Sequence, residues 1–220
     1  LTRHHVSVTL REPVATTVVE QEFYNPNDRT LEGIYLFPVP TGAQLDQFTM
    51  EVGGKQVAAE LLPADQARKL YEDIVRQQRD PALLEYIGRD LFKVRIFPLE
   101  PRSRKPVKLR YTQLLRADSG LTSYLYPLNT TKFSAAPIPS VSLKLDLETR
   151  RPLKSIYSPS HRVEITRSGD RRATVGFEQK DLKPDTDFQL LFATEAGDIG
   201  LNLLTAHPPG EDGYFLLLAS

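Results

Sequence analysis

The chain contains four histidines, and two of them, His4 and His5, are adjacent and could in principle bind a metal ion. Neighbouring side chains of a β-strand point to opposite faces of the sheet. Zinc requires its ligands to converge on one point, so a strand cannot present both rings to the same ion. We therefore interpret the pair as a surface feature of a flexible terminus, or as the remnant of a purification tag.

A second possible chemistry is nucleophilic, because Ser158, Ser160 and His161 share one short segment. Serine hydrolysis needs a base within hydrogen-bond reach of the hydroxyl and an acid that orients the base. The sequence has no Gly-x-Ser-x-Gly elbow. His207, the remaining histidine, lies in a proline-rich segment. These residues therefore do not predict a hydrolase.

Three carboxylates alternate in the segment DLKPDTD, at Asp181, Asp185 and Asp187. Closely spaced carboxylates in a turn can hold calcium. The segment lacks the glycine and the distal glutamate of an EF-hand loop, whereas aspartate commonly caps turns through its own side chain. We interpret the three as turn-capping residues, and calcium binding stays an open alternative.

The densest basic run could bind an acidic partner. It consists of Arg102, Arg104, Lys105, Lys108 and Arg110. Lys108 and Arg110 share one face of a predicted strand, which favours a solvated surface. Lys+Arg and Asp+Glu both number 28, so the net charge is zero. Because aromatic residues are not interleaved with the run either, the sequence argues against nucleic-acid binding.

The composition is that of a globular protein of one or two domains, with 40% hydrophobic residues. Cysteine is absent, which excludes disulfides, thiolate catalysis and cysteine metal sites. No apolar run approaches the roughly 18–20 residues that span a bilayer. The first residues do not form a signal-peptide pattern. We therefore expect no transmembrane segment in this chain.

The first part of the chain, residues 1–117, predicts an antiparallel β-sandwich with a helix packed over one opening. Apolar residues recur with helical spacing between 64 and 79, at Ala67, Leu70, Tyr71, Ile74 and Val75. Asp80-Pro81 predicts a second, short helical turn over 82–86. Gly53-Gly54 predicts a hairpin turn. Alternation and β-branched residues predict strands at 5–10, 15–24, 31–37, 44–52, 55–62, 91–97 and 107–115.

A second part, residues 118–220, follows the break at Asp118-Ser119-Gly120 and is expected to be an all-β, sandwich-like domain. Ser168-Gly169-Asp170 predicts a hairpin turn. No segment of helical length and period is evident. Strands are predicted at 121–126, 140–147, around Ile156, and at 163–167, 172–178, 188–193 and 214–218.

An ordered series of motifs in residues 1–116 resembles the VIT domain, the vault protein inter-alpha-trypsin domain. The matching segments are Asn25-Pro26, 36–40 (LFPVP), 48–54 (FTMEVGG), 67–75 (ARKLYEDIV), 90–92 (DLF) and 107–111 (VKLRY). The second part is similar to the segment that links this domain to a von Willebrand factor type A domain in bacterial members. Its matching segments are 158–161 (SPSH), 169–175 (GDRRATV), 187–188 (DF) and 213–217 (GYFLL).

The resemblance implies a non-catalytic module that precedes a von Willebrand A domain carrying a metal-dependent adhesion site. That site needs an Asp-x-Ser-x-Ser stretch, which this chain lacks. We therefore expect no catalytic, cofactor or metal residue here, and expect the chain to be the N-terminal part of a longer protein. The implied role is interaction or scaffolding in a bacterial adhesion-type protein that is secreted, periplasmic or at the cell surface.

The implied partners are the downstream von Willebrand A domain and another protein or matrix component. Asn129-Thr130-Thr131 fits a glycosylation acceptor, which we treat as chance in a bacterial protein. Two alternative functions remain. A carboxylate-based hydrolase would need two acids with separated pKa values in one cleft. A carbohydrate-binding sandwich would need an exposed aromatic platform, but tryptophan is absent and the tyrosines mostly occupy core-like strand positions.

Overall fold

The structure, a computed structural model, is almost entirely β within the residues it describes. These are 1–52, 55–58, 61–62, 82–88, 91–118, 120–129, 136–195, 201–206 and 212–219. They contain no helix, and the helix predicted at 64–79 lies outside them. The prediction of a mainly β chain is confirmed.

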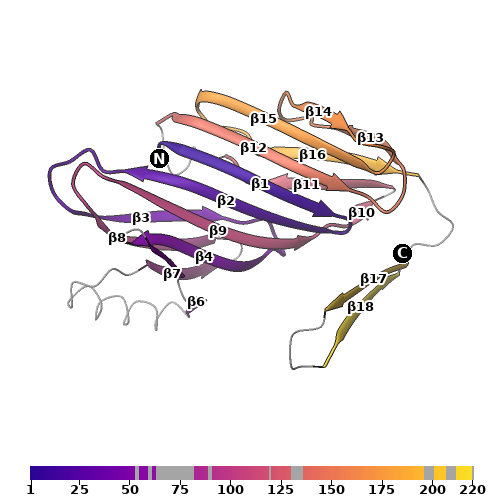
Figure 1. The fold of residues 1–220 in the computed structure, drawn as a ribbon, viewed down its shortest axis with the longest axis horizontal. Coiled ribbons are helices and arrows are strands. Elements are labelled where there is room, and N and C mark those ends of the chain that lie inside the picture. The colour runs from indigo at the N-terminus through magenta and orange to yellow at the C-terminus, as the bar shows by residue number, and fades with distance from the viewer. Residues whose placement is uncertain are drawn as a thin grey trace.

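The largest layer, here called the main sheet, has eight strands (Figure 1). Its order is β14 (Glu164–Arg167), β15 (Arg172–Leu182), β12 (Ile138–Glu148), β1 (Arg3–Arg11), β2 (Val14–Tyr24), β9 (Arg104–Leu114), β4 (Gln44–Val52) and β5 (Lys55–Ala58).

Two four-stranded sheets cover one face of the main sheet (Figure 1). The amino-side sheet has the order β3 (Leu31–Pro38), β8 (Leu91–Leu99), β7 (Ala82–Gly88) and β6 (Leu61–Leu62). The carboxyl-side sheet has the order β10 (Ala117–Asp118), β11 (Leu121–Tyr126), β16 (Phe188–Thr194) and β13 (Leu153–Tyr157). A terminal hairpin of β17 (Leu201–Ala206) and β18 (Tyr214–Ala219) forms a separate two-stranded sheet.

Buried and outward-facing side chains alternate along the strands, which explains why the sheets stack face to face. In β1, the side chains of His4, Val6, Val8 and Leu10 are at most 2% exposed, and the residues between them lie on the opposite face. The buried face of the main sheet packs on both smaller sheets: Tyr111 of β9 meets Phe37 of β3, with ring centroids 6.4 Å apart, and His4 of β1 meets Tyr126 of β11 at 5.8 Å. One continuous hydrophobic core therefore joins the three sheets.

The sheets are mixed, so the prediction of a purely antiparallel sandwich is wrong in this respect. β1 runs parallel to β12, with Arg3 opposite Ser140, and β6 runs parallel to β7. Strands from both predicted parts thus lie side by side in the main sheet, and the predicted boundary after residue 117 falls inside β10. Whether the two parts form separate domains stays a prediction.

The predicted helical turn at 82–86 is also wrong, because these residues belong to β7 and pair antiparallel with β8. Hydrogen bonding to a neighbouring strand overrides the local helix-start pattern of Asp80-Pro81. The predicted strand at 55–62 is divided between β5 and β6, which join different sheets. The β4–β5 hairpin pairing is confirmed, with Val52 opposite Lys55.

Candidate functional site

A buried polar network lies where the three sheets meet, and His4 is at its centre. The side-chain amide of Gln21 donates to His4 Nδ1 and to the Tyr35 hydroxyl, both at 2.8 Å. An imidazole that accepts at Nδ1 carries its proton on Nε2. His4 Nε2 therefore donates to the hydroxyl oxygen of Tyr126, 2.7 Å away. The network links β1 and β2 of the main sheet to β3 and β11 of the two covering sheets.

Burial controls the electrostatics of this network. Desolvation, helped by the neighbouring His5, lowers the pKa of His4 to about 4, so the ring is neutral at pH 7. Burial also raises the pKa of Tyr35 and of Tyr126 above the usual range. The amide oxygen of Gln21 is buried and has no hydrogen-bond partner among the described residues. The hydrogen bonds of these neutral, enclosed groups therefore connect the three sheets.

The interpretation of the histidine pair as a flexible surface feature is therefore wrong for His4. The burial of His4 could have been inferred from the sequence, because His4 lies on the same alternating face of β1 as Val6, Val8 and Leu10, and this face packs into the core. The prediction that the two rings take opposite faces is confirmed. His5 lies on the outer face of the main sheet, where its Nδ1 is 2.6 Å from Ser142 Oγ.

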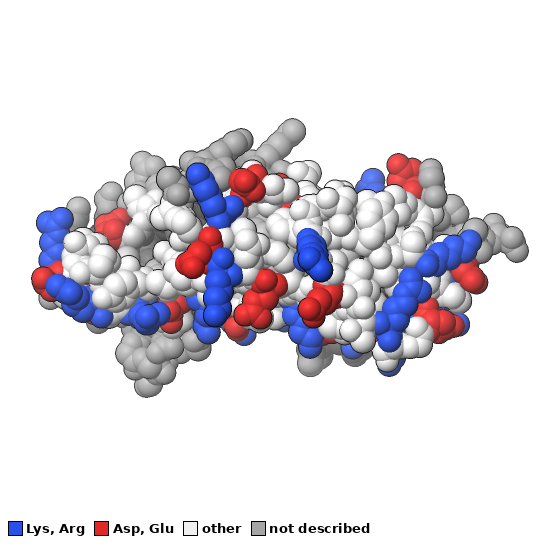
Figure 2. Space-filling model, turned by 90° about the horizontal axis from the view of Figure 1, so that it is seen from above, with Lys and Arg blue, Asp and Glu red and all other residues white. Residues whose placement is uncertain are grey.

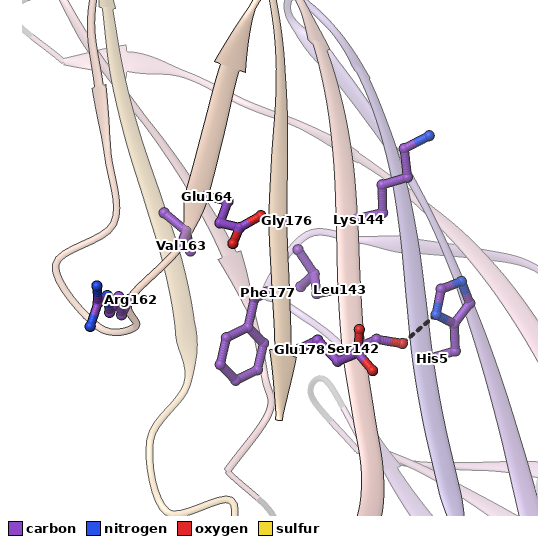
Figure 3. Close-up of a pocket in the computed structure, with 10 residues that line it drawn as sticks. All are labelled: His5, Ser142, Leu143, Lys144, Arg162, Val163, Glu164, Gly176, Phe177 and Glu178. Atoms are coloured by element: carbon purple, nitrogen blue, oxygen red, sulfur yellow. Dashed lines mark hydrogen bonds between the residues drawn. The ribbon is translucent and has the colours of Figure 1, made fainter. Parts of the chain in front are cut away.

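His5 lies at one end of an open hollow of about 600 Å³ on that outer face (Figure 3). The hollow crosses β1, β12, β15 and the start of β14. Its charged residues carry both signs: Lys144, Arg162, Glu164 and Glu178. Figure 3 shows Lys144 and Glu164 on opposite sides of the strand that carries Gly176. No sequence motif marked this hollow, because its residues come from separate strands.

The Ser158–His161 segment is held together as a structural turn. His161 Nδ1 is 2.9 Å from Ser160 Oγ, but Ser160 Oγ also accepts a hydrogen bond of 2.8 Å from the backbone amide of Gln189. The oxygen is thus engaged with β16. The His161 ring contacts Phe177 edge-on, and burial lowers its pKa. These contacts hold the segment against β15 and β16, and the absence of hydrolase activity stays a prediction.

The aspartates of the 181–187 segment hold the chain by hydrogen bonds. Asp187 accepts from the backbone amide of Asn129 at 2.8 Å, and the backbone carbonyl of Asp185 accepts from the Asn129 side chain at 2.6 Å. Asp181 has a positive φ of 50°. The cited contacts of Asp185 and Asp187 therefore join this segment to the loop at Asn129, and turn capping by the three aspartates stays a prediction. Among the described residues, no group of three or more histidines or carboxylates is arranged to hold a metal ion.

The basic run is neutralised residue by residue. Lys108 pairs with Glu20 at 2.9 Å, and Arg110 lies 3.6 Å from Asp46. The other pairs are Arg102 with Asp28 at 2.7 Å, Arg104 with Glu22, and Lys105 with Glu100 at 3.5 Å. On the face seen in Figure 2, blue and red side chains are interspersed. The run offers no uncompensated positive patch, so binding of an acidic partner is not favoured by its geometry.

The outer face of the carboxyl-side sheet differs from this charged surface. β11 and β16 carry no charged residue. Leu121, Leu125 and Tyr157 on this side of the sheet are 37%, 40% and 47% exposed. The alternate residues of β11, Tyr124 and Tyr126, are fully buried, as the sequence predicted for most tyrosines. The two central strands thus present an uncharged strip with exposed leucines, flanked by Asp118 of β10 and Lys154 of β13, and an exposed apolar strip is typical of a surface that another protein covers.

Within the described residues, no helix is long and apolar enough to cross a bilayer. Residues 1–111 match the family model of the vault protein inter-alpha-trypsin domain. The von Willebrand factor A domain-containing protein 5A of Mus musculus is 31% identical over 125 residues, 56% of this chain and 16% of that protein. The inter-alpha-trypsin inhibitor heavy chain H6 of Homo sapiens is 24% identical over 187 residues, 84% of this chain and 14% of that protein.

The fold is also similar to a crystal structure from Legionella pneumophila, of a protein to which a nutrient-binding role has been ascribed. The two structures compare with a TM-score of 0.58 at 16% sequence identity, and the match covers 88% of this chain and 66% of the Legionella chain. At this identity the likeness concerns the fold alone. The chain spans about a sixth of the length of the curated relatives described above.

Proposed function

Because the chain belongs to the vault protein inter-alpha-trypsin domain family, we propose that it is a non-catalytic interaction module that braces a von Willebrand A domain following it in the same polypeptide. The observation that carries the proposal is the uncharged centre of the outer face of the carboxyl-side sheet, formed by β11 and β16; Asp118 of β10 and Lys154 of β13 lie on the flanking edge strands. Its strands β11 and β16 lack charge, whereas the outer face of the main sheet is covered with ion pairs.

The order of elements along the chain supports this occupant. The central strand β16 leads to the terminal hairpin, whose strands LNLLTA and YFLLLA also lack charged residues. Tyr214 and Phe215 at the start of β18 are 59% and 75% exposed. A two-stranded hairpin is only marginally stable by itself in water. The hairpin thus presents two exposed aromatic side chains, and the relative named for a von Willebrand A domain is far longer than this chain.

Hydrogen–deuterium exchange tests the proposal in the chain alone and in the same chain extended through the next domain. We expect amide protection in 121–125 and 153–157 to rise in the extended protein, because docking excludes water from that face. Leu125→Lys and Tyr157→Lys should cancel the increase by placing a charge in an apolar contact. Thr9→Lys, an exposed strand position on the charged face, is the matched control.

Unchanged protection of both segments in the extended protein would rule out this docking surface. Loss of protection in Thr9→Lys as well would show that the variants act through general destabilisation. We extend the proposal to an adhesion-type protein that is secreted, periplasmic or at the cell surface, on the basis of the family resemblance. Fractionation of cells expressing the full protein tests that placement, and recovery with cytosolic markers would contradict it.

A further inference from the structure

The structure of the chain itself gives no reason for a glycine at position 176 of β15. The residue lies in a strand interior, and its φ is outside the left-handed region. The pairing of β15 with β12 and with β14 continues past it without a register shift. A Cβ added there would meet no atom within 4 Å. Glycine weakens a strand and often marks a place where a ligand approaches the backbone closely.

The register places opposite charges on either side of this glycine. Lys144 of β12 and Glu164 of β14 are both directly opposite Gly176. Adjacent strands are about 4.8 Å apart, so the backbones that carry the two charges are separated by roughly 10 Å. Because Gly176 has no side chain, its backbone lines the hollow between Lys144 and Glu164. Glu178 lies two residues further along the same face, opposite Ser142.

The charges around this gap are not neutralised as they are elsewhere on the main sheet. Glu164, Glu178 and Arg162 form no ion pair with any residue that the structure describes. Lys144 lies 3.5 Å from Asp146, but both side chains are more than half exposed. An exposed pair of this kind contributes little. Lys144 is therefore able to turn towards a ligand.

We propose that the hollow over Gly176 binds a small zwitterion of amino-acid or dipeptide size. The ligand's ammonium group lies against Glu164 and Glu178, its carboxylate against Lys144, and its backbone over Gly176. Side chains stand roughly perpendicular to a sheet. Figure 3 shows the Lys144 side chain directed away from Gly176, so it must turn upright to meet a ligand. With both charged ends above their own strands, two charge-assisted hydrogen bonds of about 2.8 Å each would leave roughly 4–5 Å between the ligand's own charges. The volume of about 600 Å³ suits such a molecule.

Titration of the chain with glycylglycine, followed by NMR chemical shifts and calorimetry, tests this site. We expect saturable binding, with shifts confined to β12, β14 and β15. N-acetylglycinamide, which keeps a similar backbone but carries no charge, should not bind. Gly176→Val should weaken binding at least about tenfold, yet raise the thermal midpoint by about 2–4 °C because valine favours strands.

Thr166→Val, on the outer face of β14 but outside the hollow, is the matched control and should bind as the wild type does. Glu164→Gln changes a single exposed group and should weaken binding about tenfold even if the valine variant folds poorly. The proposal is overturned if glycylglycine produces no saturable shift at millimolar concentration. It is equally overturned if the neutral probe binds as well, or if Glu164→Gln binds as the wild type does.

Discussion

Replacing Asn25 with alanine is expected to lower the free energy of unfolding by about 3 kcal/mol, because its side chain joins two loops from inside the protein. Asn25 is 2% exposed. Its amide nitrogen lies 2.9 Å from the carbonyl oxygens of Arg29 and Leu99 and 3.0 Å from that of Glu100. Its side-chain oxygen accepts from the backbone amide of Asn27 at 3.0 Å.

The variant would remove the donor that reaches the partly buried carbonyl oxygens of Arg29, Leu99 and Glu100, and each such loss is costly. Urea denaturation measures the effect as a lower midpoint at an unchanged slope. Asn25→Asp keeps the shape but cannot donate, so it should lose at least as much. Asn27→Ala removes a contact of 3.2 Å at an exposed position and should cost under about 1 kcal/mol. Equal losses in the Asn25→Ala and Asn27→Ala variants would contradict the central role of Asn25.

The stability of the protein is expected to fall by about 3 kcal/mol through His4 alone as the pH is lowered from 6.5 to 4. In the folded protein the pKa of His4 is about 4, whereas its value in the unfolded chain is 6.5. Between these values the unfolded state binds a proton that the folded state does not. His4 therefore stabilises the fold fully above pH 6.5, and this contribution is lost as the pH falls through 4.

Urea denaturation of the wild type and of His4→Gln across this range measures the difference. The variant is expected to be less stable at pH 7.5, because glutamine fills the site less well. The free energy that it loses between pH 6.5 and 4 should nevertheless be smaller by about 3 kcal/mol. His5→Gln separates the two neighbouring rings. If His5→Gln rather than His4→Gln removed the acid-dependent loss, the assignment to the buried ring would be wrong.

Local patterns were sufficient to predict most strands. The alternation in 140–147 corresponds to β12, and Ser168-Gly169-Asp170 does connect β14 to β15, with Gly169 at a φ of 77°. β17 was not predicted, because in LNLLTA the polar residues Asn202 and Thr205 fall on opposite faces, so the segment lacks a clean apolar–polar alternation. The order of motifs along the first half was enough to recognise the family, which the match over 1–111 confirms.

The candidate sites depended much more on the fold. Residues 102–110 formed a basic run in sequence, but acids from other strands and loops neutralise it, and their positions follow from sheet pairing. The opposed charges of Lys144 and Glu164 arise only because β15 lies between β12 and β14. No spacing of residues along the chain predicts that Lys144 and Glu164 lie on either side of β15.

The sequence by itself determined most of the strands and, through alternation, which side of them faces the core, as in β1 with Val6, Val8 and Leu10. Only the tertiary structure decided that β1 pairs with β12, that 82–88 form a strand, and that a gap between unlike charges opens over Gly176. The physical reason is that alternation is a local property of the backbone. Strand partners, by contrast, are selected by burial and hydrogen bonding between segments distant in the chain.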